Sequence, residues 1–504
     1  AGSGKTSIAL HRAAYLLYRH RNNLKAENIA LFAPNEAFSD YISNVLPELG
    51  EENIQYKTMN SVVMHHLGDS FIKYEIYDEY MENLLLGKNT DRIKKRTGMI
   101  RFKASKEFAG IIEDYVKNLE DTFDMFCDIT SGNYIFAEKK ELYKLFHTSF
   151  DGMPVAKRLS QINFMIKNRI REYEPHRQKE IEHELDDRTD LNAREIKALS
   201  RLNVTKELDG TRKALDDMCA LNIVSLYRSL FSDYLAKRMN AGSLPEDLIN
   251  YTVNALDDGL LLYEDQAPML YLMFLLGMVE SDKDTKHVII DEAQDYSCAM
   301  FKLILRLYSQ SNIAILGDPM QNINSYGSIG DLKELRDLYN GDMDYLELGK
   351  SYRSTQEIMN FAFRIIPAKF ETFGRHGLQP SINTANTFDE MCNLLTDYLT
   401  EVLKENYNRI AVICRTMNDC KLLHERISAK VKTNLIEKGN DHIPSGIIII
   451  PSYITKGLEF DLVAAVIGNA DDYIGEDTLL YTVCTRALHR LDIFSVKDAN
   501  VLDK

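Results

Sequence analysis

The first six residues of the chain, AGSGKT, have the composition of a loop that binds phosphates. Gly2-Ser3-Gly4-Lys5-Thr6 matches the second half of such a loop, whose first glycine would lie before residue 1. The glycines let the backbone wrap an anion, and a helix that begins near Lys5 would direct its N-terminal N–H groups at the phosphates. Lys5 would contact the outer phosphates, and the Thr6 hydroxyl would bind magnesium. The loop therefore predicts a site for a nucleoside triphosphate and Mg²⁺.

A second segment, HVIIDEAQDYS, places acidic side chains directly after a predicted buried strand at 287–290. Open α/β sheets bind ligands at the carboxyl ends of their strands, so we expect Asp291 and Glu292 to lie beside the loop. Asp291 would hold the metal, directly or through a water, and Glu292 would orient the attacking water. A solvated cap is the alternative for this segment alone, and the presence of GSGKT disfavours it.

Three further polar residues could act on the same phosphates. In NIAILGDPMQNI, the amide of Gln321 could hydrogen-bond the γ-phosphate or the attacking water, although a surface position is the alternative. Phosphoryl transfer also needs positive charge, which Arg353 in GKSYRSTQE and Arg486 in LLYTVCTRALHRL could supply. Each arginine alone would be an ordinary ion-pair residue. Together they predict a clamp that closes on the nucleotide from the second half of the chain.

Alternating strands and helices must position these residues. Continuous apolar runs typical of buried strands occur before residue 60 and again after residue 281, and they indicate an α/β fold with parallel sheets covered on both faces. The runs are NIALF, HVII, NIAIL, RIAVIC, GIIII and DLVAAVI. Between them, residues 61–280 have the periodicity of helices. The strand–helix fold is therefore expected to carry a large helical insertion.

The charged part of this insertion follows Pro175 and has a thin apolar stripe among charges of both signs. A solvated pair of helices explains this pattern, and so does an arm that inserts into a partner. The stripe comprises Ile181, Leu185, Leu191, Ile196, Leu199, Val204 and Leu208.

Composition restricts the classes of protein that remain. The 504 residues suffice for about three domains. A net charge of −15 argues against a protein that coats nucleic acid through bulk charge, so any DNA contact would be a local groove. Seven scattered cysteines favour a reducing, cytoplasmic setting. The longest apolar run, at 268–279, is too short to span a bilayer, and no membrane partner is expected.

The order of the motifs resembles the superfamily-one helicases of the UvrD/Rep type, over residues 1–60 and 281–504. The motifs are AGSGKT, DEAQD, GDPMQNI, SYRS, TKGLEFD and YTVCTRA. This resemblance implies two RecA-like lobes, at 1–60 plus 281–345 and at 346–504. It implies ATP and Mg²⁺ between the lobes, single-stranded nucleic acid across their tops, and a monomeric ATPase.

The resemblance also implies roles for individual residues. Tyr352 would stack on the base, and Gly457 and Glu459 would contact the nucleotide, with the carboxylate on the ribose. Arg353 and Arg486 would touch the γ-phosphate. Three residues would contact the nucleic-acid strand, namely Thr58, Ser61 and Tyr326, although core packing is an equal alternative for the tyrosine.

Two departures from the helicase pattern stand out. Asn324 and Gly327 replace the usual tyrosine and arginine around the stacking aromatic, which argues against processive unwinding. About 100 residues separate SYRS from TKGLEFD, which leaves no room for the large accessory domain of those helicases.

The chain resembles HelD-like proteins more narrowly, through PNEAFSDYISNVLPELGEENIQYKT and IIPSYITKGLEFD. HelD-like proteins bind bacterial RNA polymerase and release it from nucleic acid, and they carry an N-terminal coiled-coil arm and a helical insertion. The resemblance implies that residues 61–280 bind the polymerase and that the coiled-coil arm precedes residue 1. A UvrD/Rep-type 3′–5′ DNA translocase or helicase in repair or replication is the alternative, and a nucleotide-gated scaffold is a third.

Overall fold

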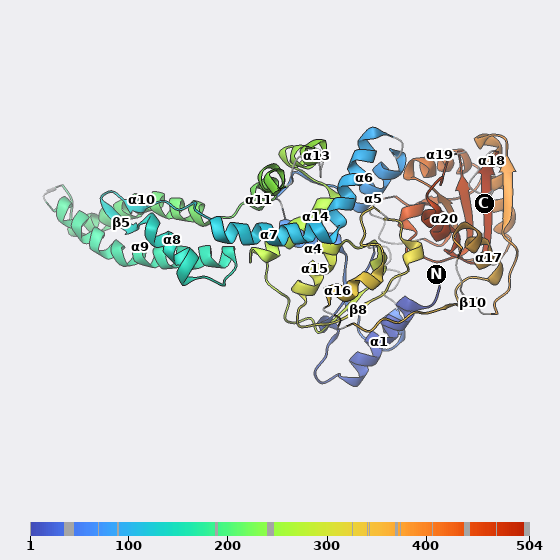
Figure 1. Ribbon diagram of the computed structural model, residues 1–504, viewed down its shortest axis with the longest axis horizontal. Helices are drawn as coiled ribbons and strands as arrows, with labels where there is room; N and C mark the ends of the chain where they lie inside the picture. Colours follow the sequence, from blue (N-terminus) through green and yellow to red (C-terminus); the bar gives the residue numbers. More distant parts are fainter. Residues whose placement is uncertain are drawn as a thin grey trace. The chain divides into compact units, whose positions relative to one another are not determined.

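The computed structural model describes residues 2–34, 45–68, 70–87, 90–186, 190–238, 246–324, 326–339, 341, 343–367, 371–372, 374–405, 407–437, 444–469 and 471–497. Residues 35–44, part of the segment that carries the HelD resemblance, lie outside this description. The chain forms two compact units (Figure 1). We call residues 1–109, 257–268 and 281–504 the sheet unit, and residues 110–256 and 269–280 the helical unit.

The sheet unit begins with a four-stranded parallel sheet, the first sheet, in the order β2-β1-β7-β8. Apart from the partly buried His287 at the start of β7, its central strands β1 and β7 are apolar and buried, as expected for parallel strands covered by helices. Phe32, Ile290 and Ile315 lie in register at the carboxyl edge. The residues that follow them therefore gather at one edge. The strands are β1 (Ile29–Phe32), β2 (Gln55–Lys57), β7 (His287–Ile290) and β8 (Asn312–Ile315).

Short helices accompany the first sheet. Helix α1 (Lys5–Arg19) buries Ala9, Leu10, Ala13 and Leu17 in the same core as β1, which the spacing of these residues on one helical face explains. The others are α3 (Val45–Glu48), α4 (Met59–Leu67), α15 (Cys298–Leu307) and α16 (Leu335–Leu338).

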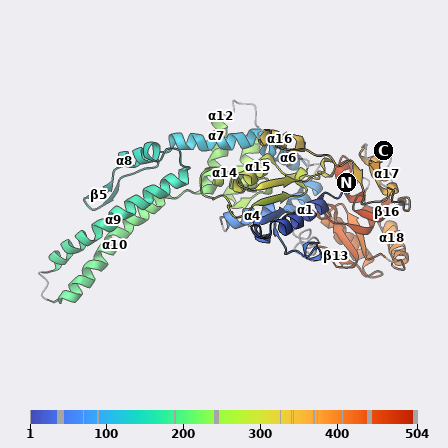
Figure 2. The same ribbon diagram turned by 90° about the horizontal axis from the view of Figure 1, so that it is seen from below.

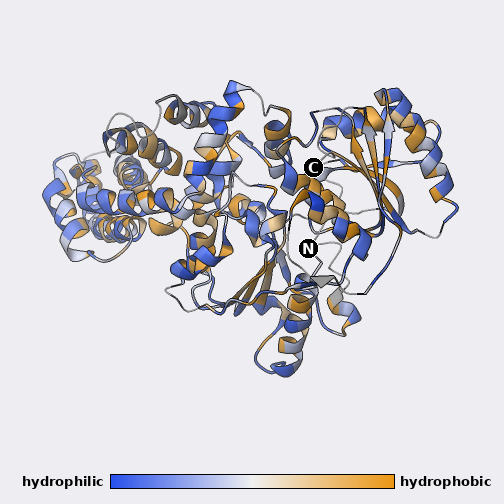
Figure 3. Ribbon diagram, turned by 45° about the vertical axis from the view of Figure 1, so that its right-hand side comes forward, coloured by the Kyte–Doolittle hydropathy of each residue, from blue (hydrophilic) through white to orange (hydrophobic). Residues whose placement is uncertain are grey.

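The second sheet has six parallel strands in the order β11-β16-β15-β12-β14-β13. Alternate residues of β12 enter different cores: Val412 contributes to one face and Ile413 to the other. Both faces of the sheet are therefore buried, and its strands are largely apolar (Figure 3). The strands are β11 (Ser381–Ala385), β12 (Arg409–Cys414), β13 (Asn434–Leu435), β14 (Gly446–Pro451), β15 (Phe460–Ile467) and β16 (Ala487–Val496).

Helices cover both faces of the second sheet. They are α17 (Gln356–Ile365), α18 (Phe388–Val402), α19 (Met417–Ile427) and α20 (Asp477–Cys484). A two-stranded parallel ladder pairs β9 (Lys350–Ser351), before α17, with β10 (Glu371–Thr372), after α17. The two parallel sheets confirm the predicted α/β fold.

The helical insertion expected at 61–280 is longer than the helical unit. Helices α5 (Tyr77–Leu86) and α6 (Asp91–Ala104) belong to the sheet unit, with the short ladder β3 (Lys73–Tyr74) and β6 (Leu260–Leu261). Tyr80 and Leu84 of α5 lie in the same core as Ile413 of the second sheet, because the apolar face of α5 is buried there. The compact helical unit, residues 110–256 plus 269–280, is therefore shorter than the insertion expected at 61–280, whose boundaries stay a prediction.

The helical unit is built mainly on two long helices, α9 (Val155–Leu185) and α10 (Ala193–Cys219), which lie side by side (Figures 1 and 2). Pro175 lies inside α9 and does not end it. Its other elements are α7 (Lys106–Thr122), β4 (Ile129–Ser131), β5 (Tyr134–Ala137), α8 (Lys139–Lys144), α11 (Ile223–Ser229), α12 (Ala236–Arg238), α13 (Glu246–Asp257) and α14 (Tyr263–Leu275). Helices α7 and α14 connect it to the sheet unit.

The apolar stripe predicted after Pro175 joins the two long helices. Ile181, Val204 and Leu208 are buried, while Arg177 pairs with Glu207 across the helices at 3.2 Å. The stripe therefore belongs to a helical pair, and insertion of this pair into a partner stays a prediction. In the described part of the chain, no helix is both long and apolar enough to cross a bilayer.

Candidate nucleotide site

The phosphate loop has the backbone that the sequence predicts. Gly2 and Gly4 adopt left-handed φ values of 69° and 75°, and α1 begins at Lys5. Gly2 is also tightly enclosed, because a Cβ there would lie 2.5 Å from the Cβ of Arg353. The Tyr352 N–H donates to the Gly2 carbonyl at 2.9 Å. The loop is therefore in direct contact with the SYRS segment, more than 340 residues downstream.

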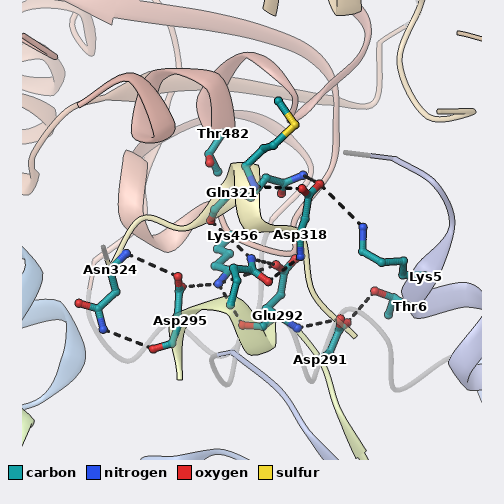
Figure 4. Close-up of polar contacts among 12 residues, drawn as sticks. Lys5, Thr6, Asp291, Glu292, Asp295, Asp318, Gln321, Asn324, Lys456 and Thr482 are labelled. Carbon is teal, nitrogen blue, oxygen red and sulfur yellow. Dashed lines mark hydrogen bonds and ion pairs between the residues drawn. The ribbon is translucent and has the colours of Figure 1, made fainter. Parts of the chain in front are cut away.

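Thr6 and Asp291 face each other at the carboxyl edge of the first sheet. The Thr6 Oγ1 hydroxyl donates to Asp291 Oδ2 at 2.6 Å (Figure 4). Burial raises the pKa of Asp291 to about 6, and the adjacent Glu292 carboxylate adds to the shift. A hydroxyl and a buried carboxylate are hard oxygen ligands of the kind Mg²⁺ takes. The two residues thus fit the predicted magnesium site, and the assignment stays a prediction.

Glu292 occupies an unusual backbone position, with a left-handed φ of 51°. Such conformations are costly for a residue with a Cβ and gather at functional sites. Its carboxylate accepts from Gln294 Nε2 at 2.6 Å and lies 3.7 Å from Lys456 Nζ. Burial raises the pKa of Glu292, but the charges of Lys456 and Arg486 outweigh it and bring the pKa below its usual range. An ionised carboxylate is the form that accepts a proton from water.

Gln321 is buried, so the alternative of a surface position is wrong. Its Nε2 donates to Asp318 Oδ2 at 3.0 Å, and Asp318 lies 3.8 Å from Lys5 Nζ. Its Oε1 accepts from the Arg486 guanidinium. One amide therefore bridges a strand end of the first sheet and an arginine that follows α20.

Arg486 is fully buried, and its guanidinium also donates to the carbonyls of Thr482 and Leu458. Burial, and then the charge of Arg353, lowers the pKa of Arg486 to about 10. Arg353 forms an ion pair with Glu459 at 2.6 Å. The two predicted arginines are thus near enough for their charges to interact, and Arg486 contacts Gln321. Glu459, predicted to contact the ribose, is held here by Arg353.

The remaining predicted nucleotide contacts lie at the same place. Tyr352 is 54% exposed, so its ring is accessible for stacking. Gly457 has a left-handed φ of 81°, which the turn before β15 requires. Ser3 lies beside Lys5, whose Nζ donates to the Ser3 Oγ at 3.4 Å.

Two functional candidates escaped the sequence prediction. Lys456 is almost fully buried and pairs with Asp295 and with Glu292, the predicted base (Figure 4). Its position directly before Gly457 in TKGLEFD was the available signal. Asp318 pairs with Lys5, and its place three residues after the end of β8 was the signal there.

The predicted nucleic-acid contacts have local partners. Thr58 and Ser61 form a reciprocal cap at the start of α4, each side chain accepting from the other's backbone N–H at 3.0 Å. Tyr326 is half-buried against the core, and the Arg101 guanidinium lies 4.7 Å from its ring centroid. These contacts favour structural roles for the three residues, and their contact with a nucleic-acid strand stays a prediction.

Known proteins resemble this chain in sequence. A protein of Acanthamoeba polyphaga mimivirus named as an ATP-dependent DNA helicase is 27% identical over 213 residues, 37% of this chain and 30% of the viral protein. The ATP-dependent DNA helicase srs2 of Schizosaccharomyces pombe is 32% identical over 105 residues, 20% of this chain and 12% of the yeast protein. The chain thus spans less than a third of either relative's length.

A solved structure and a family model also match. The C-terminal domain of a possible DNA helicase from Lactobacillus plantarum WCFS1 is 31% identical, with a TM-score of 0.27, over 30% of this chain and 92% of that domain. The model described as the UvrD/REP helicase N-terminal domain matches residues 1–328, well over half of the chain. The chain therefore belongs to the UvrD/REP helicase family.

Proposed function

We propose that the chain is an ATP-hydrolysing motor with its nucleotide between the first sheet and the second. The hydrogen bond from Arg486 to Gln321 carries this proposal, because it joins an arginine beside the second sheet to the segment after β8, in which Asp318 pairs with Lys5 of the phosphate loop. In a site of this kind, charge on the transferring phosphoryl group is stabilised from both sides.

Each residue then has a chemical role. Lys5, Arg353 and Arg486 hold the phosphate oxygens, and a triphosphate would compensate the buried charge of Arg486, whose pKa is lowered by burial and by the charge of Arg353. Glu292 accepts a proton from the attacking water, and Gln321 orients that water. Thr6 and Asp291 hold Mg²⁺, which when bound neutralises charge on the phosphates.

The proposed substrate of the motor is a complex of bacterial RNA polymerase with nucleic acid, from which the polymerase is released. The HelD-like segments around LPELGE and IIPSYITKGLEFD support this assignment. The helical unit supports it too, because α9 and α10 provide two long exposed helix faces as a surface for a protein partner. Thr58, Ser61 and Tyr326 are engaged by local partners, which leaves fewer side chains free to bind a nucleic-acid strand.

A 3′–5′ DNA translocase or helicase is the second candidate, favoured by the names of the mimivirus and yeast relatives. The two candidates differ in what stimulates ATP turnover. Single-stranded DNA alone should stimulate a translocase, which would unwind a tailed duplex. A polymerase-releasing motor should respond to RNA polymerase instead.

The test uses the full-length protein with purified bacterial RNA polymerase bound to a labelled template. The proposal predicts co-purification with the polymerase and ATP-dependent release of the template. Unwinding of a tailed duplex without polymerase capture would overturn the proposal in favour of the helicase.

A further inference from the structure

Asn324 is one of the two positions that depart from the helicase pattern, and its side chain has a defined place. It is buried, and its Oδ1 accepts a hydrogen bond from the Tyr80 hydroxyl at 2.8 Å. Tyr80 belongs to α5 and is fully buried. The segment after Gln321 is therefore connected to a helix some 240 residues earlier in the chain.

Gly327, the second departure, makes room for this arrangement. A Cβ at position 327 would lie 2.7 Å from both the Oδ1 and the Nδ2 of Asn324, a distance that real Cβ atoms do not show. The φ of Gly327 is not left-handed, so space rather than backbone conformation requires the glycine. The two departures are therefore one feature: the glycine admits the asparagine amide.

On its other side Asn324 reaches Asp295, close to the predicted base. Its backbone N–H donates to Asp295 Oδ1 and its Nδ2 to the Asp295 carbonyl, both at 3.5 Å (Figure 4). Asp295 pairs with Lys456. The Lys456 Nζ also lies 3.4 Å from the Glu292 carbonyl and 3.7 Å from Glu292 Oε2. A continuous set of polar contacts thus runs from Tyr80 to Glu292.

Helix α5 is fixed at a second point. Glu82 accepts from the N–H groups of Met417 and Asn418 at 2.9 and 3.1 Å, at the first turn of α19, and from the Tyr453 hydroxyl at 2.8 Å. A carboxylate at a helix N-terminus is stabilised by the helix dipole and by these donors. Because α19 covers the second sheet, α5 contacts elements of both sheets.

Buried ion pairs fix the segment that directly precedes the N-terminus of α5. Arg96 of α6 forms ion pairs with Glu75 and Glu264, and its guanidinium lies 5.4 Å from the Tyr80 ring centroid. Breaking a buried pair of this kind is strongly destabilising, because a charge is left without compensation. The Tyr80 hydroxyl is therefore presented to Asn324 from a rigid support.

We propose that Asn324 is a positioning residue, which with Tyr80 and Gly327 couples α5 to the catalytic Glu292 through Asp295 and Lys456. The inference rests on the proposed ATPase function of Glu292. A shift of α5 relative to α19 would move Lys456. The position of the Glu292 carboxylate, which accepts the proton, would change with it. Since α6 and then α7 follow α5 in the chain, the same contacts give the helical unit a route to the hydrolysis step.

The test compares Tyr80→Phe with Tyr77→Phe in the full-length protein. Tyr77 is on the same helix and in the same aromatic cluster, but among the described residues its buried hydroxyl has no hydrogen-bond partner. Losing the Tyr80 hydroxyl leaves the Asn324 acceptor unpaired, so we expect kcat for ATP to fall by about 3- to 10-fold with KM within about twofold. Tyr77→Phe should change neither value.

Gly327→Ala and Asn324→Ala complete the test. Gly327→Ala should reproduce the kcat loss of Tyr80→Phe, because the new Cβ displaces the amide. The double variant Tyr80→Phe/Asn324→Ala should lose no more than Asn324→Ala alone, since both act through one contact. Thermal unfolding of every variant shows whether a loss of kcat follows a loss of folded protein.

Two results would overturn the inference while leaving the proposed function intact. In the first, the wild-type protein hydrolyses ATP, and kcat of the Tyr80→Phe variant equals kcat of the Tyr77→Phe variant. The other is additive losses in the double variant. A folded wild-type protein without any ATP turnover would instead overturn the proposed function, and this inference with it.

Discussion

The Arg486 guanidinium donates a hydrogen bond to the Oε1 of Gln321, although 165 residues separate them in sequence. The same Gln321 donates to Asp318, which pairs with Lys5. Both sheets therefore contribute to one polar cluster. A change in this cluster should alter the chemistry of ATP more than the stability of either sheet.

Glu292→Gln removes the predicted proton acceptor and keeps the shape of the side chain. We expect kcat to fall by about 100-fold or more, because general base catalysis contributes about that much. ATP affinity should stay within about twofold. Single-turnover hydrolysis and binding of a fluorescent ATP analogue measure the two quantities. Unchanged turnover would mean that another group activates the water.

Arg353→Ala removes a cation that is 20% exposed and pairs with Glu459. We expect kcat to fall by about 100- to 1000-fold, since arginines on the transferring phosphoryl group contribute at least this much in related chemistry. Arg364→Ala is the matched control, because Arg364 lies over the Phe361 ring on α17. Equal activity of the two variants would place Arg353 outside the site.

Gly2→Ala tests the close approach of the loop to SYRS. The new Cβ would be 2.5 Å from the Arg353 Cβ, at a φ of 69° that disfavours any side chain. Gly50→Ala has a similar φ of 81° and no neighbouring atom within 4 Å, so it isolates the conformational cost, about 1–2 kcal/mol of stability. We expect weaker ATP binding, measured by titration, for Gly2→Ala only.

Thr58→Ala separates a helix cap from a strand contact. As a cap, the residue contributes about 1 kcal/mol to the free energy of unfolding, which thermal or denaturant melts would report. Basal ATP turnover should be unchanged. A loss of affinity for single-stranded DNA with unchanged stability would assign Thr58 to nucleic-acid binding instead.

Shortening the α9–α10 pair tests the partner-binding role of the helical unit. Residues 178–206 can be removed and the helices joined where Arg177 pairs with Glu207, which keeps the buried contacts nearer the other end, such as Ile170. The proposed function predicts weaker capture of RNA polymerase with unchanged basal ATP turnover. Capture equal to that of the wild type would exclude the removed part as a binding element.

The sequence predicted the residues of the first sheet's edge well, for a simple reason. Parallel strands end at one edge, so Asp291 and Gln321 had to gather near the phosphate loop once their strands were recognised. The strand runs are continuous and apolar, which makes them the clearest local signals in the chain. The helical periodicity of the pair was also visible, but the pair was expected after Pro175, whereas α9 begins at Val155 and continues through that proline.

The unit to which α5 and α6 belong was less predictable. An amphipathic helix shows that one face is buried but not in which core, so α5 was placed with the insertion although Tyr80 and Leu84 pack beside the second sheet. The pairing of Lys456 with Asp295 and the space at Gly327 for Asn324 depend on long-range contacts. No local spacing encodes them.

Single-turnover ATP hydrolysis by Arg486→Lys is the most direct test of a nucleotide site shared by the two sheets. Lysine keeps a positive charge but cannot donate to Gln321, Thr482 and Leu458 at once, as the buried arginine does. We expect the hydrolysis rate to fall by at least about 100-fold, while the variant still binds ATP and thermal unfolding shows that it is still folded. A folded variant that hydrolyses ATP at the wild-type rate would contradict a nucleotide site shared by the two sheets.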